Sequence, residues 1–339
     1  MSAMVPTRHR VQIAVAVGIA ELIIKLLQVT YGSSRSDFGQ IWYASRAALA
    51  GHNPYALVGP GLAFDWPAPL VYPLTAAVAA APLAALPQNL ANVVFCGVAA
   101  GLLAWALCRT SYWPLLGLCS YSAVTAFRSV QWAPIFAAAV VLPPLSFLLV
   151  AKPTIGAAIF VARPSRWAVI GAAVLGPAAF LLQPDWMQEW VAAVQRDAAL
   201  WSPADPYRLP LLLPGGFLVV LCLARWRRTE ARLVLALACV PQSLWPYDML
   251  PLYLVPRTAV ESVVLVVLGG VVALLTPSLA QTLAPAATLD GVGGMTILLL
   301  YLPVTIMVLR RPNEGTIPTW IERRVNRWPG WLRGEPRKA

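Results

Sequence analysis

Asp37 has the residue type and position that best suit proton-transfer chemistry in this sequence. Ser36 is a candidate helix N-cap, the run 37–50 has helical composition, and Gly51 is a natural stop, so Asp37 falls in a first helical turn. A carboxylate there is stabilised in its ionised form by the helix dipole. Beside Arg35 at a membrane surface, it can accept a proton from a hydroxyl nucleophile. The alternative is an aspartate that only starts a helix, and local spacing does not decide between them.

Lys152 is the second charged residue that needs an explanation, because it stands between an apolar stretch and Pro153. A charge at membrane depth costs roughly 2.5–3.5 kcal/mol on insertion scales, so some partner must offset that cost. The partner is a ligand, a carboxylate such as Asp248 or Asp37, or water reached by snorkelling. Asp248 follows Tyr247 at an expected helix break. Two roles are open for it there: binding ligand hydroxyls or a cation, or making a buried structural hydrogen bond.

Metal, redox and nucleic-acid chemistry fit the sequence poorly. The five cysteines lie in or beside apolar stretches without CxxC spacing, and His9 and His52 are the only two histidines. No metal, haem or other cofactor is therefore expected. The net charge of +11 comes from basic residues that bunch between apolar stretches instead of forming an interleaved surface, so no nucleic-acid partner is expected.

The elements that must position these residues are membrane helices. Of the 339 residues, 59% are hydrophobic and 12% are charged, which excludes an ordinary soluble enzyme. About ten apolar segments approach the roughly 20 residues that a membrane-spanning helix needs. They are 11–30, 70–86, 90–107, 113–127, 132–150, 167–183, 209–224, 232–245, 259–275 and 293–309. With two shorter pieces, 154–162 and 247–257, the predicted fold is an all-α polytopic membrane protein of about ten to twelve spanning or half-spanning helices.

The orientation follows from the basic residues, which are expected on the cytoplasmic side. The sequence divides into a membrane domain, 1–309, and a basic cytoplasmic tail, 310–339, with both termini cytoplasmic and the acidic loops 31–68 and 184–208 external. Threading the segments alternately puts Gln131 near the cytoplasmic side. The partner expected for all of these apolar segments is the lipid bilayer.

Two interfacial helices are expected in the external loops. In the first loop Phe38, Trp42, Ser45 and Leu49 follow three- and four-residue spacings, which indicates an amphipathic helix with Trp42 at headgroup depth. The segment 185–201 is expected to lie in the interface in the same way. Within the first span, Glu21 and Lys25 are four residues apart and are expected to pair on one helix face.

Several short motifs resemble glycosyltransferase family 87, a GT-C class of membrane enzymes that was once a family of unknown function. The resemblance covers roughly residues 33–255 and is most specific near its start. The motifs are Ser36-Asp37-Phe38, Gly51-His52-Asn53-Pro54-Tyr55, Val71-Tyr72-Pro73, Val130-Gln131, Ala151-Lys152-Pro153-Thr154 and Trp245-Pro246-Tyr247-Asp248. Val130 stands where the family usually has glycine, and Tyr247-Asp248 stands near where its mannosyltransferases often carry histidine, which leaves the donor sugar open.

The resemblance implies an inverting transfer of a mannose- or arabinose-like sugar from a polyprenyl-phosphate donor to an envelope lipid or glycan acceptor. Asp37 would be the catalytic base. Lys152, Arg35 and Arg208 would bind the donor phosphate, and Gln131, Tyr247, Asp248 and Trp42 would contact substrate. No metal is required, because protein cations can stabilise a phosphate leaving group. The expected location is the bacterial inner (plasma) membrane.

Two other functions remain open at this point. An inactive GT-C-like chain could serve as a structural subunit of a membrane complex with further protein partners. A lipid or solute transporter would also use broken helices and an intramembrane lysine.

Overall fold

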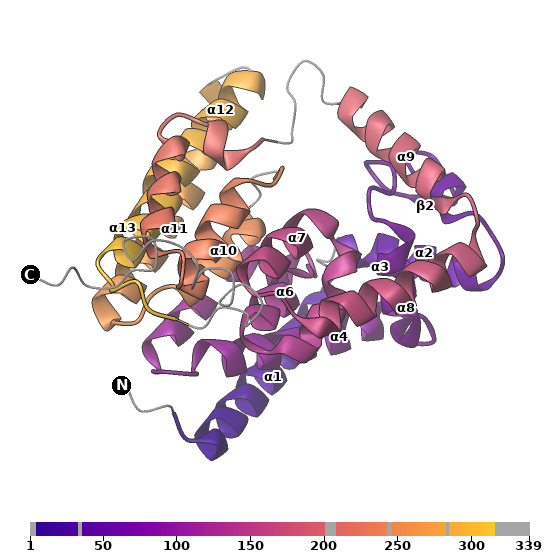
Figure 1. Cartoon of the computed structure of the whole chain (residues 1–339). Helices are drawn as coiled ribbons and strands as arrows, with labels where there is room; N and C mark the ends of the chain where they lie inside the picture. Colours follow the sequence, from indigo (N-terminus) through magenta and orange to yellow (C-terminus); the bar gives the residue numbers. More distant parts are fainter. Residues whose placement is uncertain (1–4, 33–35, 201–207, 243–245, 283–284, 316–339) are drawn as a thin grey trace, which may run out of the picture.

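The structure, a computed structural model, describes residues 5–32, 36–200, 208–242, 246–282 and 285–315. It is built almost wholly of helices (Figure 1). The α-helices are α1 Thr7–Thr30, α2 Asp37–Leu49, α3 Leu74–Ala84, α4 Gln88–Leu107, α5 Tyr121–Arg128, α6 Ala133–Val141, α7 Pro153–Ala162, α8 Arg166–Leu182, α9 Trp186–Leu200, α10 Thr229–Ala238, α11 Ala259–Thr282, α12 Pro285–Thr296 and α13 Leu302–Leu309.

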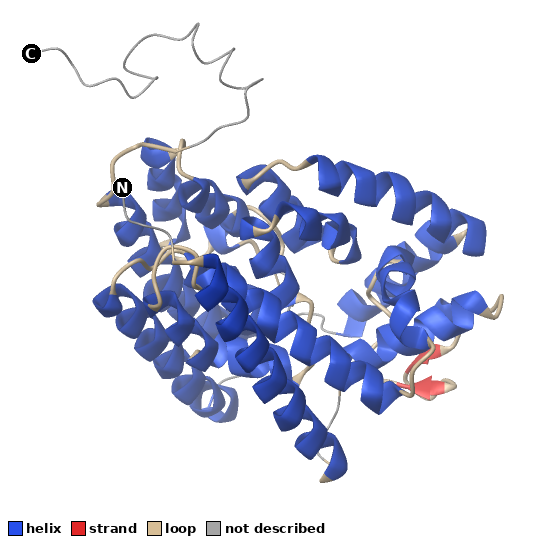
Figure 2. Cartoon of the chain, turned by 90° about the horizontal axis from the view of Figure 1, so that it is seen from below, coloured by secondary structure: helices blue, strands red, loops and turns tan. Residues whose placement is uncertain are grey.

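Shorter elements connect these helices. The tighter 3₁₀ segments are η1 Pro54–Ala56, η2 Trp113–Cys119, η3 Pro143–Ala151, η4 Pro210–Leu212, η5 Gly216–Arg225 and η6 Pro246–Leu254, and η7 Ile297–Tyr301 is a π-helical turn. Two short strands, β1 Val58–Gly59 and β2 Phe64–Asp65, pair within the first loop at the edge of the molecule (Figure 2).

Four helical stretches of the described chain are long and apolar enough to cross a membrane, which agrees with a polytopic membrane protein. They are Thr7–Thr30, Gln88–Leu107, Ala259–Thr276 and Gly291–Leu309. Helices α8 and α9 would add a fifth if they formed one span, but they bend by 91° at their junction. The total of ten to twelve spanning or half-spanning helices stays a prediction.

Prolines divide several segments that the hydropathy pattern suggests as single spans. The stretch 132–150 forms α6 and then η3, because Pro143 has no N–H to continue the helix and begins a new one. The stretch 113–127 is also two short helices, η2 and α5, but there the break is at Ser120, which caps the start of α5. The chain therefore turns inside the bundle where the sequence pattern predicts an uninterrupted crossing.

Helix α1 lies antiparallel along α4, with glycines at the contact. A Cβ on Gly18 would lie 2.9 Å from the carbonyl oxygen of Gly97, and a Cβ on Gly101 would lie 2.9 Å from that of Ala14. Small residues allow two membrane helices to approach this closely. Most of the remaining surface of α1 is exposed apolar side chains, as expected of a helix that faces lipid.

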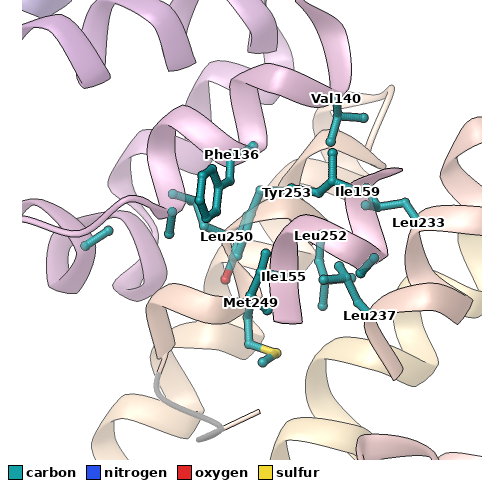
Figure 3. Packing of buried hydrophobic residues seen from close by; sticks show 14 of the residues in the cluster. Phe136, Val140, Ile155, Ile159, Leu233, Leu237, Met249, Leu250, Leu252 and Tyr253 are labelled. Carbon is teal, nitrogen blue, oxygen red and sulfur yellow. The ribbon is translucent and has the colours of Figure 1, made fainter. Parts of the chain in front are cut away.

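The core of the bundle lies between α6, α7, α10 and η6. Figure 3 shows their apolar side chains interdigitating; the labelled residues are Phe136, Val140, Ile155, Ile159, Leu233, Leu237, Met249, Leu250, Leu252 and Tyr253, all buried. This packing fixes the short helices α6 and α7, which are too short to be held in place by the membrane alone.

Charged segments gather at opposite ends of α4. The basic segments meet near its C-terminal end through three hydrogen bonds: Val5 N–H to the Arg109 carbonyl, the Arg225 side chain to the Arg311 carbonyl, and the Arg232 side chain to the Ala162 carbonyl. The acidic first loop and α9 meet at the other end, where the Trp190 indole donates to the Val71 carbonyl at 2.8 Å. Basic segments that are far apart in the sequence therefore lie together at the C-terminal end of α4, with Glu230 and Glu261 paired among them.

Candidate functional site

Asp37 begins α2 where the end of α5 meets it. The Asp37 N–H donates to the Ser129 carbonyl at 2.9 Å, so the first free amide of one helix satisfies a terminal carbonyl of another. Ser36 occupies the N-cap position, but its hydroxyl donates to the buried Asn92 side chain on α4 at 3.0 Å and makes no capping bond. Ser36 is therefore the N-cap residue that the sequence predicts, but its side chain connects α2 to α4 instead of capping the helix.

The Asp37 carboxylate accepts a hydrogen bond from the Gln131 side-chain amide. The Gln131 carbonyl oxygen in turn accepts from the Tyr72 hydroxyl at 3.2 Å, and the Tyr72 backbone carbonyl accepts from the Tyr55 hydroxyl at 3.1 Å. This network corrects the threading that puts Gln131 at the cytoplasmic side, because Gln131 and Asp37 lie at the same depth. The error arises from reading 113–127 and 132–150 as full crossings.

The turn that presents Gln131 has the geometry of a Schellman motif. After α5 ends, the Val130 N–H bonds to the Phe127 carbonyl and the Gln131 N–H bonds to the Ala126 carbonyl. Val130 has a φ of 52°, in the left-handed region, and is buried. A β-branched residue is strained there, whereas glycine is not. A glycine-glutamine pair is therefore the natural sequence for this turn, and this chain holds the glutamine in place despite a strained valine.

Lys152 lies at the joint between η3 and α7, and its ammonium is 2.6 Å from the Asp248 carboxylate. Asp248 is almost fully buried in η6, while about a fifth of the Lys152 side chain is exposed. The ammonium also lies 5.1 Å from the centre of the Tyr247 ring, within cation–π range. The carboxylate partner that the sequence leaves open is thus Asp248.

The electrostatics connect Asp37 to Lys152. Burial raises the pKa of Asp37 from 3.8 to about 6, while the positive charge of Lys152 and the hydrogen bond from Gln131 act in the opposite direction. The charge of Lys152 is therefore felt at Asp37, although it is paired with Asp248. We call Asp37, Gln131, Tyr72, Lys152 and Asp248 the Asp37 cluster.

A lysine from the first span, Lys25, contacts the end of the helix that precedes Gln131. The Lys25 ammonium is fully buried and donates to the Arg128 carbonyl at 3.1 Å, at the C-terminal end of α5. A cation is favourable at this negative end of a helix dipole. Lys25 and Glu21 interact electrostatically, as their spacing predicts, but the described residues contain no ion pair at contact distance between them. Lys25 points instead to the helix that carries Gln131.

Other predicted site residues lie outside this network or outside the described residues. The Trp42 indole donates to the Leu86 carbonyl at 3.0 Å and stacks with Arg46, contacts that tie α2 to the end of α3. The Arg208 backbone pairs with Gln242 at 2.8 and 2.9 Å, just before η6. Arg35 lies outside the described residues, as does the tail from residue 316.

Tyr72 is the member of the cluster that the sequence analysis does not assign to the site. Its signal is the Val71-Tyr72-Pro73 motif, which belongs to the resemblance but has no role there. The pairing becomes visible only when the first loop folds back over α5. The Thr75 hydroxyl helps to hold this arrangement, because it donates to the Val150 carbonyl at 2.7 Å, two residues before Lys152.

Comparisons with known proteins add no identification. No protein-family model, curated protein or solved structure matches the chain. Among the described residues, no group of three or more His, Cys, Asp or Glu side chains is placed to hold a metal ion. The chemistry of the site therefore depends on the residues of the Asp37 cluster.

Proposed function

We propose that this chain is a membrane glycosyltransferase in which Asp37 is the base. Asp37 would take the proton from an acceptor hydroxyl, whose oxygen attacks the anomeric carbon of a mannose- or arabinose-like sugar from the opposite side to the leaving group. The bond between that carbon and the phosphate oxygen breaks, its electron pair stays on the polyprenyl phosphate, and the configuration inverts. The acceptor would be an envelope lipid or glycan.

The observation that carries this proposal is the state of the Asp37 carboxyl group. A general base works best when its pKa lies near the working pH, and burial raises the pKa of Asp37 to about 6. The Gln131 amide holds the carboxylate in one orientation, which leaves one oxygen for the acceptor. Clustering of a perturbed carboxyl, a lysine and tyrosines favours a functional site over a simple helix start.

A second candidate function is a structural subunit of a membrane complex, and the Lys152–Asp248 pair favours it. The ammonium that would bind the donor phosphate is already 2.6 Å from a buried carboxylate, an arrangement that also serves a purely structural role. In the glycosyltransferase proposal, the donor phosphate would approach the exposed part of Lys152 while Asp248 keeps the ammonium oriented. A sugar-sized pocket at Asp37 stays a prediction, because the cavities at α10 and between α1 and α4 do not include this residue.

The test is the substitution Asp37→Asn in purified protein, assayed for sugar transfer from a panel of polyprenyl-phosphate sugars. Asparagine keeps the size and can accept the Gln131 hydrogen bond, but it cannot take the acceptor's proton. Turnover should fall by roughly 10²–10⁴. Asp65→Asn is the matched control, because Asp65 is an exposed carboxylate of the same loop that accepts a hydrogen bond from the nearby Gly61 N–H.

Full activity in Asp37→Asn would remove the proposed base. Absence of transfer by the unaltered protein from every donor would instead favour the structural subunit. Thermal unfolding of both variants in detergent separates loss of chemistry from loss of fold.

A further inference from the structure

A cavity of about 570 Å³ lies at the basic end of the molecule, away from Asp37. The C-terminal ends of α4, α6 and α7 and the start of α10 surround it. Its wall includes five arginines, and we call this cavity the arginine pocket: Arg109, Arg163, Arg228, Arg232 and Arg257. Two glutamates, Glu230 and Glu314, are its acidic lining residues, so the five arginines and two glutamates together give the lining a net charge of +3.

Glu230 forms ion pairs with two of the five arginines of the pocket. Glu230 pairs with Arg257 at 2.6 Å and with Arg228 at 3.5 Å. Arg163 instead donates to the carbonyls of Val140 and Val141, at the end of α6. Neutral carbonyls fix the position of a guanidinium but leave its positive charge in place.

Two further arginines of the lining, Arg232 and Arg109, differ in their surroundings. Arg232 donates to the carbonyls of Ala162, Trp226 and Arg227. The exposed Arg109 side chain has no hydrogen-bond or ion-pair partner among the described residues. Burial lowers the pKa of Arg163, and the positive charge of Arg109 lowers it further, so the two guanidinium groups repel each other. The negative ends of helix dipoles also attract arginines. That attraction alone, however, does not explain why two arginines repel each other beside a cavity of ligand size.

We propose that the arginine pocket binds a phosphate-bearing anion through Arg109 and the neighbouring guanidinium groups. Arginine forks match phosphate oxygens in pairs, and phosphate supplies the negative charge that the lining lacks. The volume leaves room for the group esterified to the phosphate. The anion is either free in solution or the headgroup of an anionic lipid, since basic pockets between membrane helices bind such headgroups.

The pocket is separate from the Asp37 cluster. Asn92, which bonds to Ser36, and Leu107, which lines the pocket, are both on α4. Fifteen residues of helix separate them, which is about 22 Å at the α-helical rise. A ligand in the arginine pocket therefore cannot be the sugar donor at Asp37, and the proposal does not depend on glycosyl transfer.

The test uses the full chain in nanodiscs of zwitterionic lipid, with inorganic pyrophosphate as the soluble probe and phosphatidylglycerol as the lipid probe. Calorimetry measures pyrophosphate binding, and native mass spectrometry measures phosphatidylglycerol retained by the protein. Arg109→Gln should weaken one of the two by about tenfold or more, because a charge-assisted contact is lost. Arg109 is exposed and unpartnered among the described residues, so this change leaves the packing intact.

Arg166→Gln is the matched control, because it removes the same charge from an exposed arginine that does not line the pocket. If Arg109→Gln loses pyrophosphate binding and Arg166→Gln does not, the ligand is a free phosphate compound. If Arg109→Gln loses phosphatidylglycerol retention and Arg166→Gln does not, the ligand is the headgroup of an anionic lipid. Failure of both probes to bind the unaltered protein, or equal losses in the two variants, would overturn the proposal. Asp37→Asn should leave either binding unchanged.

Discussion

The Asp37 cluster and the arginine pocket hold buried or half-buried charges by two different means. In the Asp37 cluster, Lys152 meets a carboxylate at 2.6 Å, and Asp37 receives a side-chain amide. In the arginine pocket, Arg163 and Arg232 donate hydrogen bonds to backbone carbonyls at helix ends. Opposite charges in the first region offset each other, whereas the second retains a positive field that a ligand can use. The same helix, α4, connects both regions.

The largest effect on stability is expected where a charge pair is broken. Lys152→Met should lower the free energy of unfolding by about 3 kcal/mol, because the buried Asp248 carboxylate loses its cation. The double variant Lys152→Met/Asp248→Asn should recover much of that loss. Arg163→Met should cost only about 1.5 kcal/mol, because the carbonyls left behind are neutral.

Unfolding by sodium dodecyl sulfate, followed by circular dichroism, measures these differences. Equal losses at the two positions, or no recovery in the double variant, would mean that the two regions do not differ as described.

The next effect concerns pH and is confined to the Asp37 cluster. Because the folded pKa of Asp37 is raised to about 6, the native state binds more protons than the unfolded chain between about pH 4 and 6. This contribution is complete below about pH 4 and is lost as the pH rises through 6, with a size of about 3 kcal/mol. Asp37→Asn should abolish this pH dependence and be the more stable form at pH 7.

The same titration should appear in catalysis. In the proposed glycosyl transfer, kcat/KM should rise with pH through about 6, because the ionised Asp37 would be the base. Lys152→Met should shift that rise to higher pH, because the lysine's charge lowers the pKa of Asp37. An unchanged profile in Lys152→Met would show that the two residues do not share a site.

The smallest effect concerns the turn at Val130. At a φ of 52°, glycine should be more stable than alanine, so Val130→Gly should exceed Val130→Ala in stability by about 1 kcal/mol. This reverses the usual order at helical positions, where glycine is the weaker residue. Thermal unfolding of the two variants makes the comparison without the confounding loss of the valine side chain, since both lack it. Greater stability of the alanine variant would contradict the left-handed geometry of the turn.

Much of the Asp37 cluster could be predicted from the sequence, because its members stand in short motifs next to helix breaks. Asp37 at a helix start and Lys152 before a proline are visible in the pattern of residue types. The depth of Gln131 could not be predicted, because hydropathy does not show that α5 and α6 are short helices that turn within the bundle. Similarly, spacing along one helix suggests Glu21 as the partner of Lys25, whereas the structure provides the Arg128 carbonyl from another helix.

The sequence by itself determined a mostly helical chain with helices apolar enough to cross a membrane, and the bunching of basic residues between apolar stretches. Both follow from composition and from the order of residues along the chain, because each segment enters the bilayer according to its own hydropathy and flanking charges. Only the tertiary structure decided which charges meet. Lys152 finds Asp248 across 96 residues, and Arg232 reaches the Ala162 carbonyl across 70. Such contacts depend on how short, proline-bounded helices pack against one another, and that packing is a property of the whole bundle and of no single segment.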